Sequence, residues 1–236
     1  MSSALVYHHL GLGDHFILNG LVRHHASRYD RIGLFAKPHN VISVAAMFRD
    51  LPQVSIISGD DQSSERYIMR NRFTLRRNRF SDVIRIGFSH LDHASGETFE
   101  EQFYAQAGLP LSAKWDLFHI ERDTDREEVL AKKVNLSSRH AFVHEDVSRG
   151  YGIDRSRITS SLPVFLPETS LTENILDYCG IILKATELHV IDSAFMFLID
   201  CLTYDASDQK LFVHRYARKN PEWTLPVLKK NWTILV

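Results

Sequence analysis

The chain has 236 residues, of which 44% are hydrophobic and 24% are charged, and its formal net charge is −1. This composition is typical of a globular protein, and the length suffices for one large domain or two small ones. The near-zero net charge excludes a global attraction to nucleic acid or to an acidic membrane, although it leaves room for a local basic patch.

The two cysteines and the N-terminus indicate the compartment. Cys179 and Cys201 lie in apolar runs of helical character and form no CxxC pair, which favours buried free thiols in a reducing compartment. The N-terminus lacks the basic start and long apolar core of a signal peptide, and no apolar run approaches the roughly 20 residues of a membrane span. We therefore expect a cytoplasmic protein without a transmembrane segment.

Short β-rich runs alternate with helical patterns in the first half of the chain. Strands are predicted at 4–8, 31–36, 53–58 and 82–87, and helices from about residue 14 and at 41–48, 65–73 and 96–108. The irregular segment 109–125, with Pro110, Trp115 and a charged stretch, marks a predicted domain boundary.

The same alternation continues in the second half. Helices are predicted at 126–134, 171–185 and 193–202 and from Pro221, and strands at 140–145, within 156–167, and at 187–192 and 210–215. Strands separated by helices imply parallel sheets, because a parallel return needs a long crossover. We therefore predict an α/β protein of two Rossmann-like halves, 1–125 and 126–236, the second ending in a helix.

A Gly-Leu-Gly-Asp turn at residues 11–14 follows the first predicted strand. Ligands of open α/β sheets bind beyond the carboxyl ends of the strands. Gly11 and Gly13 permit unusual backbone angles and a close approach of a ligand, and Asp14 is expected at or near the helix N-cap with its carboxylate toward a cleft. Alternatively, the glycines only form the turn and Asp14 only caps the helix. Phe16 stands where a dinucleotide fingerprint needs its third glycine, which argues against an NAD site.

The two ends of the chain resemble GT-B glycosyltransferases of the heptosyltransferase type, such as those that transfer heptose from ADP-heptose to lipopolysaccharide. In that family a first strand is followed by Leu-Gly-Asp and a helix, and a later strand is followed by Asp-Thr-Gly-Leu-Met-His and a helix. The matching residues here are Leu12, Gly13 and Asp14, and then Asp192, Ser193, Ala194, Phe195 and Met196. Phe197 replaces the family's histidine, and Ala194 replaces its glycine.

The resemblance implies a compact GT-B-like arrangement and a glycosyltransferase of polysaccharide biosynthesis. A nucleotide-diphospho-sugar would bind the second half and a glycan hydroxyl would enter from the first, with inversion and without a metal or another cofactor. Asp14 would be the catalytic base. The helix start at Ser193 would bind the diphosphate through backbone N–H groups, Ala194 would limit the approach of a phosphate, and Asp192 would cap the helix or contact the sugar.

Further candidates follow the second-half strands and flank the first turn. The segment 142–158 carries His144, near the end of the strand predicted at 140–145, and Arg149 in the loop beyond it. A guanidinium such as that of Arg149 can bind two phosphate oxygens, unless the loop is only solvated surface. Glu168 and Thr172 could bind ribose or base, although a helix cap is the simpler interpretation of Thr172. His9 and His15 flank the Gly-Leu-Gly-Asp turn, so either could contact acceptor or donor.

Two other residue patterns predict little by themselves. Among the 13 histidines, His8–His9 and His24–His25 are adjacent pairs whose side chains point apart, and His90 and His93 lie in an expected loop, so no metal site is predicted. The run 70–80 has five arginines with Phe73 and Phe80, a pattern typical of RNA or anionic-glycan binding. With a neutral overall charge we favour a polar helix with arginine stems over the core, and no nucleic-acid partner.

Two alternatives stay open beside the glycosyltransferase. One is a non-catalytic nucleotide- or glycan-binding protein on the same fold, and the other is an RNA-binding α/β protein that uses the arginines at 70–79. The sequence does not predict the oligomeric state, the sugar, the nucleotide or the acceptor.

Overall fold

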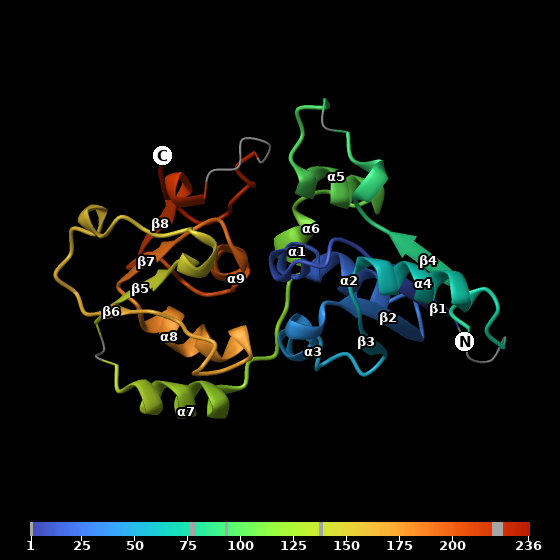
Figure 1. Cartoon of the computed structure of the whole chain (residues 1–236), viewed down its shortest axis with the longest axis horizontal. Coiled ribbons are helices and arrows are strands. Elements are labelled where there is room, and N and C mark those ends of the chain that lie inside the picture. The colour runs from blue at the N-terminus through green and yellow to red at the C-terminus, as the bar shows by residue number, and fades with distance from the viewer. Residues whose placement is uncertain (1, 76–78, 93, 137–138, 219–223) are drawn as a thin grey trace. The chain divides into compact units, whose positions relative to one another are not determined.

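The structure is a computed structural model that describes residues 2–75, 79–92, 94–136, 139–218 and 224–236, without the side chain of Ser89. The chain divides into two compact units, Met1–Glu121 and Arg122–Val236 (Figure 1). The sequence-based division was placed after Asp125, within the first turn of the helix that opens the second unit.

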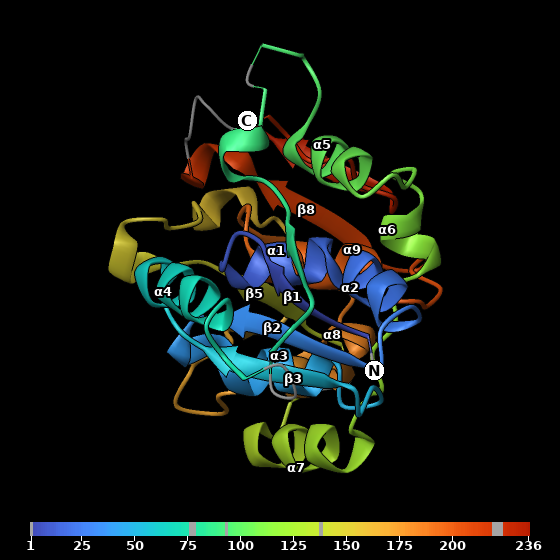
Figure 2. The same cartoon turned by 90° about the vertical axis from the view of Figure 1, so that its right-hand side faces the viewer.

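The first unit contains a four-stranded parallel sheet in the order β3-β2-β1-β4. The strands are β1 (Ser3–Tyr7), β2 (Arg31–Ala36), β3 (Val54–Ser58) and β4 (Asp82–Arg85). Figure 2 shows β1, β2 and β3 side by side. All four overlap the predicted strands, and β1 is buried along its whole length, as a central parallel strand should be.

Helices connect these strands. They are α1 (Leu12–Ile17), α2 (Asn19–Ala26), η1 (Pro38–Asn40), α3 (Val41–Met47), α4 (Asp61–Asn71), η2 (Phe88–His90), α5 (Phe99–Gln106) and α6 (Ala113–Asp116). Local chemistry sets two of the starts. Asp60 caps α4 by accepting the Ser63 N–H at 2.7 Å, and Thr98 forms a reciprocal capping box with Glu101 at the start of α5.

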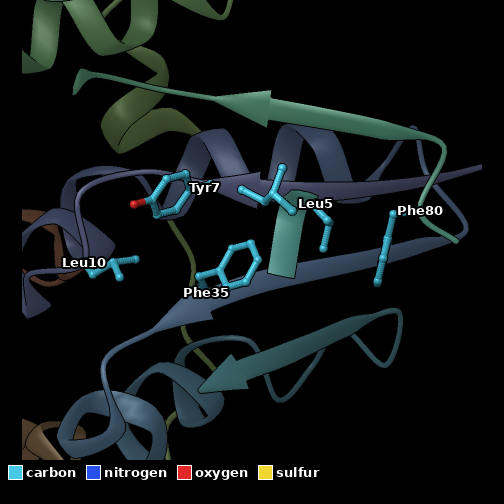
Figure 3. Packing of buried hydrophobic residues seen from close by; sticks show 6 residues of the cluster. Leu5, Tyr7, Leu10, Phe35 and Phe80 are labelled. Carbon is cyan, nitrogen blue, oxygen red and sulfur yellow. The ribbon is translucent and has the colours of Figure 1, made fainter. Parts of the chain in front are cut away.

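One core cluster of the first unit lies on the face of this sheet. Tyr7 and Phe35, from neighbouring strands, meet edge to face with ring centroids 5.6 Å apart (Figure 3). Phe80 joins the same cluster, and the Arg31 guanidinium lies 4.1 Å from the centroid of its ring.

The arginine-rich run 70–80 is therefore only partly a surface feature. Its aromatic residue Phe80 is core, whereas Phe73 is 89% exposed just beyond the end of α4. Residues 76–78 lie outside the described residues.

The second unit contains a five-stranded parallel sheet in the order β6-β5-β7-β8-β9. The strands are β5 (Ala141–His144), β6 (Val164–Phe165), β7 (Glu187–Val190), β8 (Lys210–His214) and β9 (Trp232–Leu235). The helices are α7 (Thr124–Val134), η3 (Val147–Arg149), η4 (Arg155–Arg157), η5 (Ile175–Tyr178), α8 (Cys179–Lys184), α9 (Ala194–Cys201) and η6 (Arg215–Arg218). The predicted α/β class with parallel sheets is confirmed.

The predicted C-terminal helix is wrong within the described residues. Its proposed start at Pro221 lies outside them, and the chain from Thr224 runs without helix into β9, which pairs with β8. The buried carboxylate of Asp200 holds this tail, accepting the backbone N–H groups of Lys229 and Lys230 at 2.9 and 3.0 Å and the Trp232 indole N–H at 3.0 Å. These bonds fix an extended path that the local sequence does not reveal.

The predicted helix 171–185 is shorter and in two parts. It begins with η5, because the Asn174 side chain accepts the Leu176 N–H at 3.2 Å and so caps the chain at that point. Cys179 and Cys201 are free and buried, and burial raises the pKa of the Cys179 thiol. None of the helices within the described ranges is long and apolar enough to cross a membrane.

Gly87, two residues after β4, can be used to compare how backbone strain and crowding of the core each affect stability. It has φ +86°, and a Cβ there would lie 2.6 Å from the His9 ring and 2.9 Å from Phe103. Gly96 has φ +75° with open space around it. We expect Gly96→Ala to lower the free energy of unfolding by about 1 kcal/mol and Gly87→Ala by about 3 kcal/mol, because only the second also crowds the core. Urea unfolding measures both, and equal costs would contradict the packing argument.

Candidate functional site

The turn after β1 is formed differently from the sequence-based expectation. The carbonyl of Gly11 accepts the N–H groups of Asp14 at 3.1 Å and His15 at 3.3 Å, so α1 begins at Leu12 with Gly11 as N-cap. Asp14 is therefore not the cap but the third helical residue, where a carboxylate interacts favourably with the helix dipole.

Neither glycine of this turn supplies a positive φ angle, because Gly11 is extended at φ −67° and Gly13 is helical. Gly11 is needed instead for close approach. A Cβ at this residue would lie 2.6 Å from Asp14 Oδ2, so the absent side chain leaves room for the half-buried carboxylate. Gly11 thus helps to set where the Asp14 carboxylate points.

The histidines near this turn pack against other rings of the first unit. His15 is only 1% exposed and packs edge to face on the fully buried His8, with ring centroids 4.6 Å apart. The expectation that His15 contacts a substrate is therefore wrong in this structure, because α1 turns the ring inward. His9 stacks on Phe88 and accepts its N–H at 3.1 Å, which ties the ends of β1 and β4 together.

The second unit brings three strand ends to one edge of its sheet. β5, β7 and β8 are parallel neighbours, so the residues after them lie at the same edge. The chain order reverses between β5 and β7, because β6 lies beyond β5 and β8 beyond β7. Such a topological switch point is where open α/β sheets bind ligands.

A hydrogen bond crosses this switch point. Ser193, the residue before α9, has its hydroxyl 3.0 Å from Nδ1 of His144 at the end of β5. The hydroxyl therefore does not cap its own helix, and α9 starts without a side-chain cap. Ser193 and Ala194 are half-buried. The first N–H groups of a helix have no partner within the helix, and at the start of α9 such groups can bind an anion. Burial, reinforced by two nearby arginines, lowers the pKa of His144 to about 4, so this imidazole is neutral at pH 7.

Asp192 does not cap α9 either, which corrects the capping part of the prediction. Its carboxylate Oδ2 accepts a hydrogen bond from Arg215 at 3.3 Å, and its backbone carbonyl accepts one from Arg218. Burial raises the pKa of Asp192, while the two guanidiniums oppose that rise. Asp192 therefore acts in the structure as an anchor for the segment after β8.

Two guanidiniums from different elements converge near His144. Arg149, in η3, pairs with Asp146, and its guanidinium carbon is 5.8 Å from the centroid of the Tyr151 ring. The Arg218 guanidinium carbon is 5.5 Å from the same centroid. Arg215 and Arg218 were missed by the sequence analysis. The sequence feature that could have indicated them is their position directly after the strand β8. Only the strand order, however, shows that β8 lies beside β7.

Glu168 and Thr172 are engaged in local structure. The Thr172 hydroxyl donates to Asp177 at 2.5 Å and accepts the Asn174 N–H at 3.1 Å. Thr172 thus lies two residues before the actual cap, so its predicted capping role is wrong in detail. The Glu168 carboxylate accepts from Ser170 at 2.9 Å, and its backbone is bonded to the Tyr178 hydroxyl, whose pKa burial raises to about 12. Neither side chain joins the cluster around His144 through a described contact.

Within the described part of the chain, no group of three or more His, Cys, Asp or Glu side chains could hold a metal ion. His93, half of the histidine pair considered above, lies outside that part. Metal independence stays a prediction.

Comparison with known proteins finds a likeness in fold. The chain is similar to a solved structure described as the glycosyl transferase family 9 from Veillonella parvula DSM 2008, with a TM-score of 0.64 and 10% sequence identity. The match covers 99% of this chain and 86% of that one. No protein-family model matches the sequence, and no curated protein matches it either. At this identity the likeness shows a shared two-domain α/β fold.

Proposed function

We propose that the protein transfers a sugar from a nucleotide-diphospho-sugar to a glycan hydroxyl, with inversion and without a metal, as part of polysaccharide biosynthesis in the cytoplasm. One observation supports this most. The uncapped start of α9 lies at the switch point of the second sheet, next to arginines from two other strand ends. The fold shared with a glycosyl transferase family 9 protein favours sugar transfer over other reactions that use such a site.

The charges around α9 fit a diphosphate. Arg149 pairs with the Asp146 carboxylate, Arg215 pairs with that of Asp192, and Arg218 donates to the Asp192 backbone carbonyl, so three guanidiniums gather around this end of the sheet. The dipole of α9 adds partial positive charge at the same place. When the bond between the anomeric carbon and the diphosphate oxygen breaks, the electron pair leaves with the diphosphate. Donors fixed in advance around that oxygen stabilise the charge as it develops.

Asp14 is the proposed base for the acceptor. In this reaction its carboxylate takes the proton of the acceptor hydroxyl while that oxygen forms a bond to the anomeric carbon. The proposal rests on the resemblance of the turn after β1 and on the position of Asp14 in the first turn of α1, beside Gly11. The carboxylate is half-buried, which suits a group that must both hold a defined position and meet a substrate.

A thermal-shift panel tests the proposed donor class. The panel contains nucleoside mono- and diphosphates and nucleotide-diphospho-sugars of each base. A ligand at a hundredfold its dissociation constant should add about 2.7 kcal/mol to the free energy of unfolding. Stabilisation by at least one diphosphate supports the proposal. A panel without any stabilising nucleotide would contradict it.

Replacing Arg218 should weaken the diphosphate site. We expect Arg218→Gln to raise the Kd for the best nucleoside diphosphate about 10- to 100-fold, because a hydrogen bond between charged groups contributes about 1.5–3 kcal/mol. Lys132→Gln is the control, since it removes one positive charge from an exposed residue of α7 in the same unit. Isothermal titration calorimetry measures both variants. A Kd for Arg218→Gln equal to that of the Lys132→Gln protein would place the diphosphate elsewhere.

A further inference from the structure

A chain of buried polar side chains joins β7 to η6 in the second unit. Nδ1 of His189 lies 2.9 Å from Nε2 of His214, and Nδ1 of His214 lies 2.9 Å from the Tyr216 hydroxyl. At the other end, Nε2 of His189 is 3.4 Å from the Glu187 carboxylate. Glu187, His189 and His214 are at most 6% exposed, and His189 stacks on Phe212 with ring centroids 4.5 Å apart. We call Glu187, His189, His214 and Tyr216 the relay.

With both imidazoles neutral, only one arrangement of protons satisfies every bond of the relay. The Glu187 carboxylate only accepts, so His189 carries its proton on Nε2 and accepts on Nδ1. His214 must then donate from Nε2 and accept on Nδ1, and the Tyr216 hydroxyl must donate to it. The Tyr216 oxygen in turn accepts the Asp154 N–H at 3.0 Å. In this arrangement all the bonds of the relay run in one direction, toward Glu187.

The surroundings keep the imidazoles neutral. Burial lowers the pKa of His189, although the Glu187 carboxylate opposes this shift. Burial also lowers the pKa of His214 to about 4, and the nearby Arg157 and Arg155 act in the same direction. The Lys210 ammonium group donates a hydrogen bond to the Glu187 carboxylate at 3.2 Å. A further proton on either ring would reverse the bond between His214 and Tyr216, so that the Tyr216 oxygen accepts it.

The relay ends in the segment that carries the missed arginines. Tyr216 lies in η6 between Arg215 and Arg218, which contact Asp192 before α9. The Arg157 guanidinium carbon is 4.2 Å from the centroid of the Tyr216 ring. The short segment is thus tied at its middle to the interior of the sheet while its two ends reach the start of α9.

We propose that the relay is a positioning device, in which neutral histidines hold Tyr216 so that Arg215 and Arg218 stay aligned to receive the diphosphate of a nucleotide sugar. The inference rests on the proposed function. It assigns Glu187, His189, His214 and Tyr216 as positioning residues that need not touch the substrate.

The test removes the hydroxyl of Tyr216 and, as a control, the hydroxyl of another tyrosine in the same unit. Tyr216→Phe keeps the ring beside Arg157 but breaks the bonds to His214 and Asp154. Tyr204→Phe is the control, because the Tyr204 hydroxyl donates to Gln209 at 2.8 Å in the same unit without a described contact to η6. Calorimetry with a nucleoside diphosphate should show a Kd about 10-fold weaker for Tyr216→Phe and within about 2-fold of wild type for Tyr204→Phe. In a transfer assay the KM for the donor should rise more than kcat falls.

Imidazole ¹⁵N spectra provide a readout that needs no ligand. Wild-type protein should show His189 and His214 as neutral Nε2–H tautomers at pH 7. In Tyr216→Phe the His214 signals should no longer be those of the Nε2–H tautomer alone. Another tautomer in the wild type would overturn the relay whatever the protein binds. Equal Kd values for Tyr216→Phe and wild type would overturn the positioning role and leave the proposed function intact. A wild type that binds no nucleoside diphosphate overturns both.

Discussion

Replacing Asp14 with asparagine should lower the rate of sugar transfer by about 10²- to 10⁴-fold, the usual contribution of a general base. The amide has nearly the shape of the carboxylate but cannot take the acceptor's proton. The change is conservative for the fold, because the loss of one charge in the first turn of a helix costs only about 0.3–1 kcal/mol. The Kd for the donor should stay unchanged, since the proposed donor site lies in the other unit.

Asp125→Asn is the control for this variant. Asp125 is likewise an acid in the first turn of a helix, α7, and it is exposed and outside both proposed sites. Steady-state transfer assays and calorimetry on the two variants separate catalysis from binding. Undiminished transfer by Asp14→Asn would show that Asp14 is not the base. If wild type binds a nucleoside diphosphate yet never transfers or hydrolyses a sugar, the non-catalytic binding protein becomes the better account.

The second large effect that we expect is a steep loss of stability in mild acid. Burial lowers the pKa of His8, His25, His144 and His214 from 6.5 to about 4, and it lowers that of His15 well below 6.5. Between pH 6.5 and 4 the unfolded chain therefore takes up protons that the folded chain refuses. Stability is full above pH 6.5 and is lost as the pH falls toward 4. For the fully buried His8 alone the loss approaches about 3 kcal/mol.

This loss is large beside the total stability of a domain, about 5–15 kcal/mol. Affected histidines occur in both units, so both should unfold in this pH range. The ring nitrogens of His15 have no hydrogen-bond partner among the described residues, so His15→Met should move the acid midpoint to lower pH. His39→Gln, at an exposed residue, should leave it unchanged. Circular dichroism against pH measures the midpoints. A wild type fully folded at pH 4 would contradict the argument.

Much of the fold could be predicted from the sequence because local patterns determine it. The run 31–36 is β2 with the predicted bounds, and the helix expected at 41–48 is α3. Errors arose where distant groups decide. The C-terminal tail follows an extended path because Asp200, about 30 residues earlier in the chain, binds its backbone.

The candidate site was predictable only in part. His144 ends one recognisable strand, Asp192 and Ser193 follow another, and the structure brings them together at the switch point. Arg215 and Arg218 could not be placed there, because the sequence does not reveal that β8 lies next to β7. The burial of His15 depends on which face of the six-residue helix α1 it occupies. A helix that began one residue earlier or later would place His15 on a different face.

A crystal structure of the protein saturated with a nucleoside diphosphate tests the central claim most directly. We expect phosphate oxygens about 3 Å from the first backbone nitrogens of α9. The Arg218 guanidinium should contact the same phosphate group, and Ser193 should still be hydrogen-bonded to His144. A nucleotide that binds elsewhere, while the start of α9 stays without it, would contradict the account.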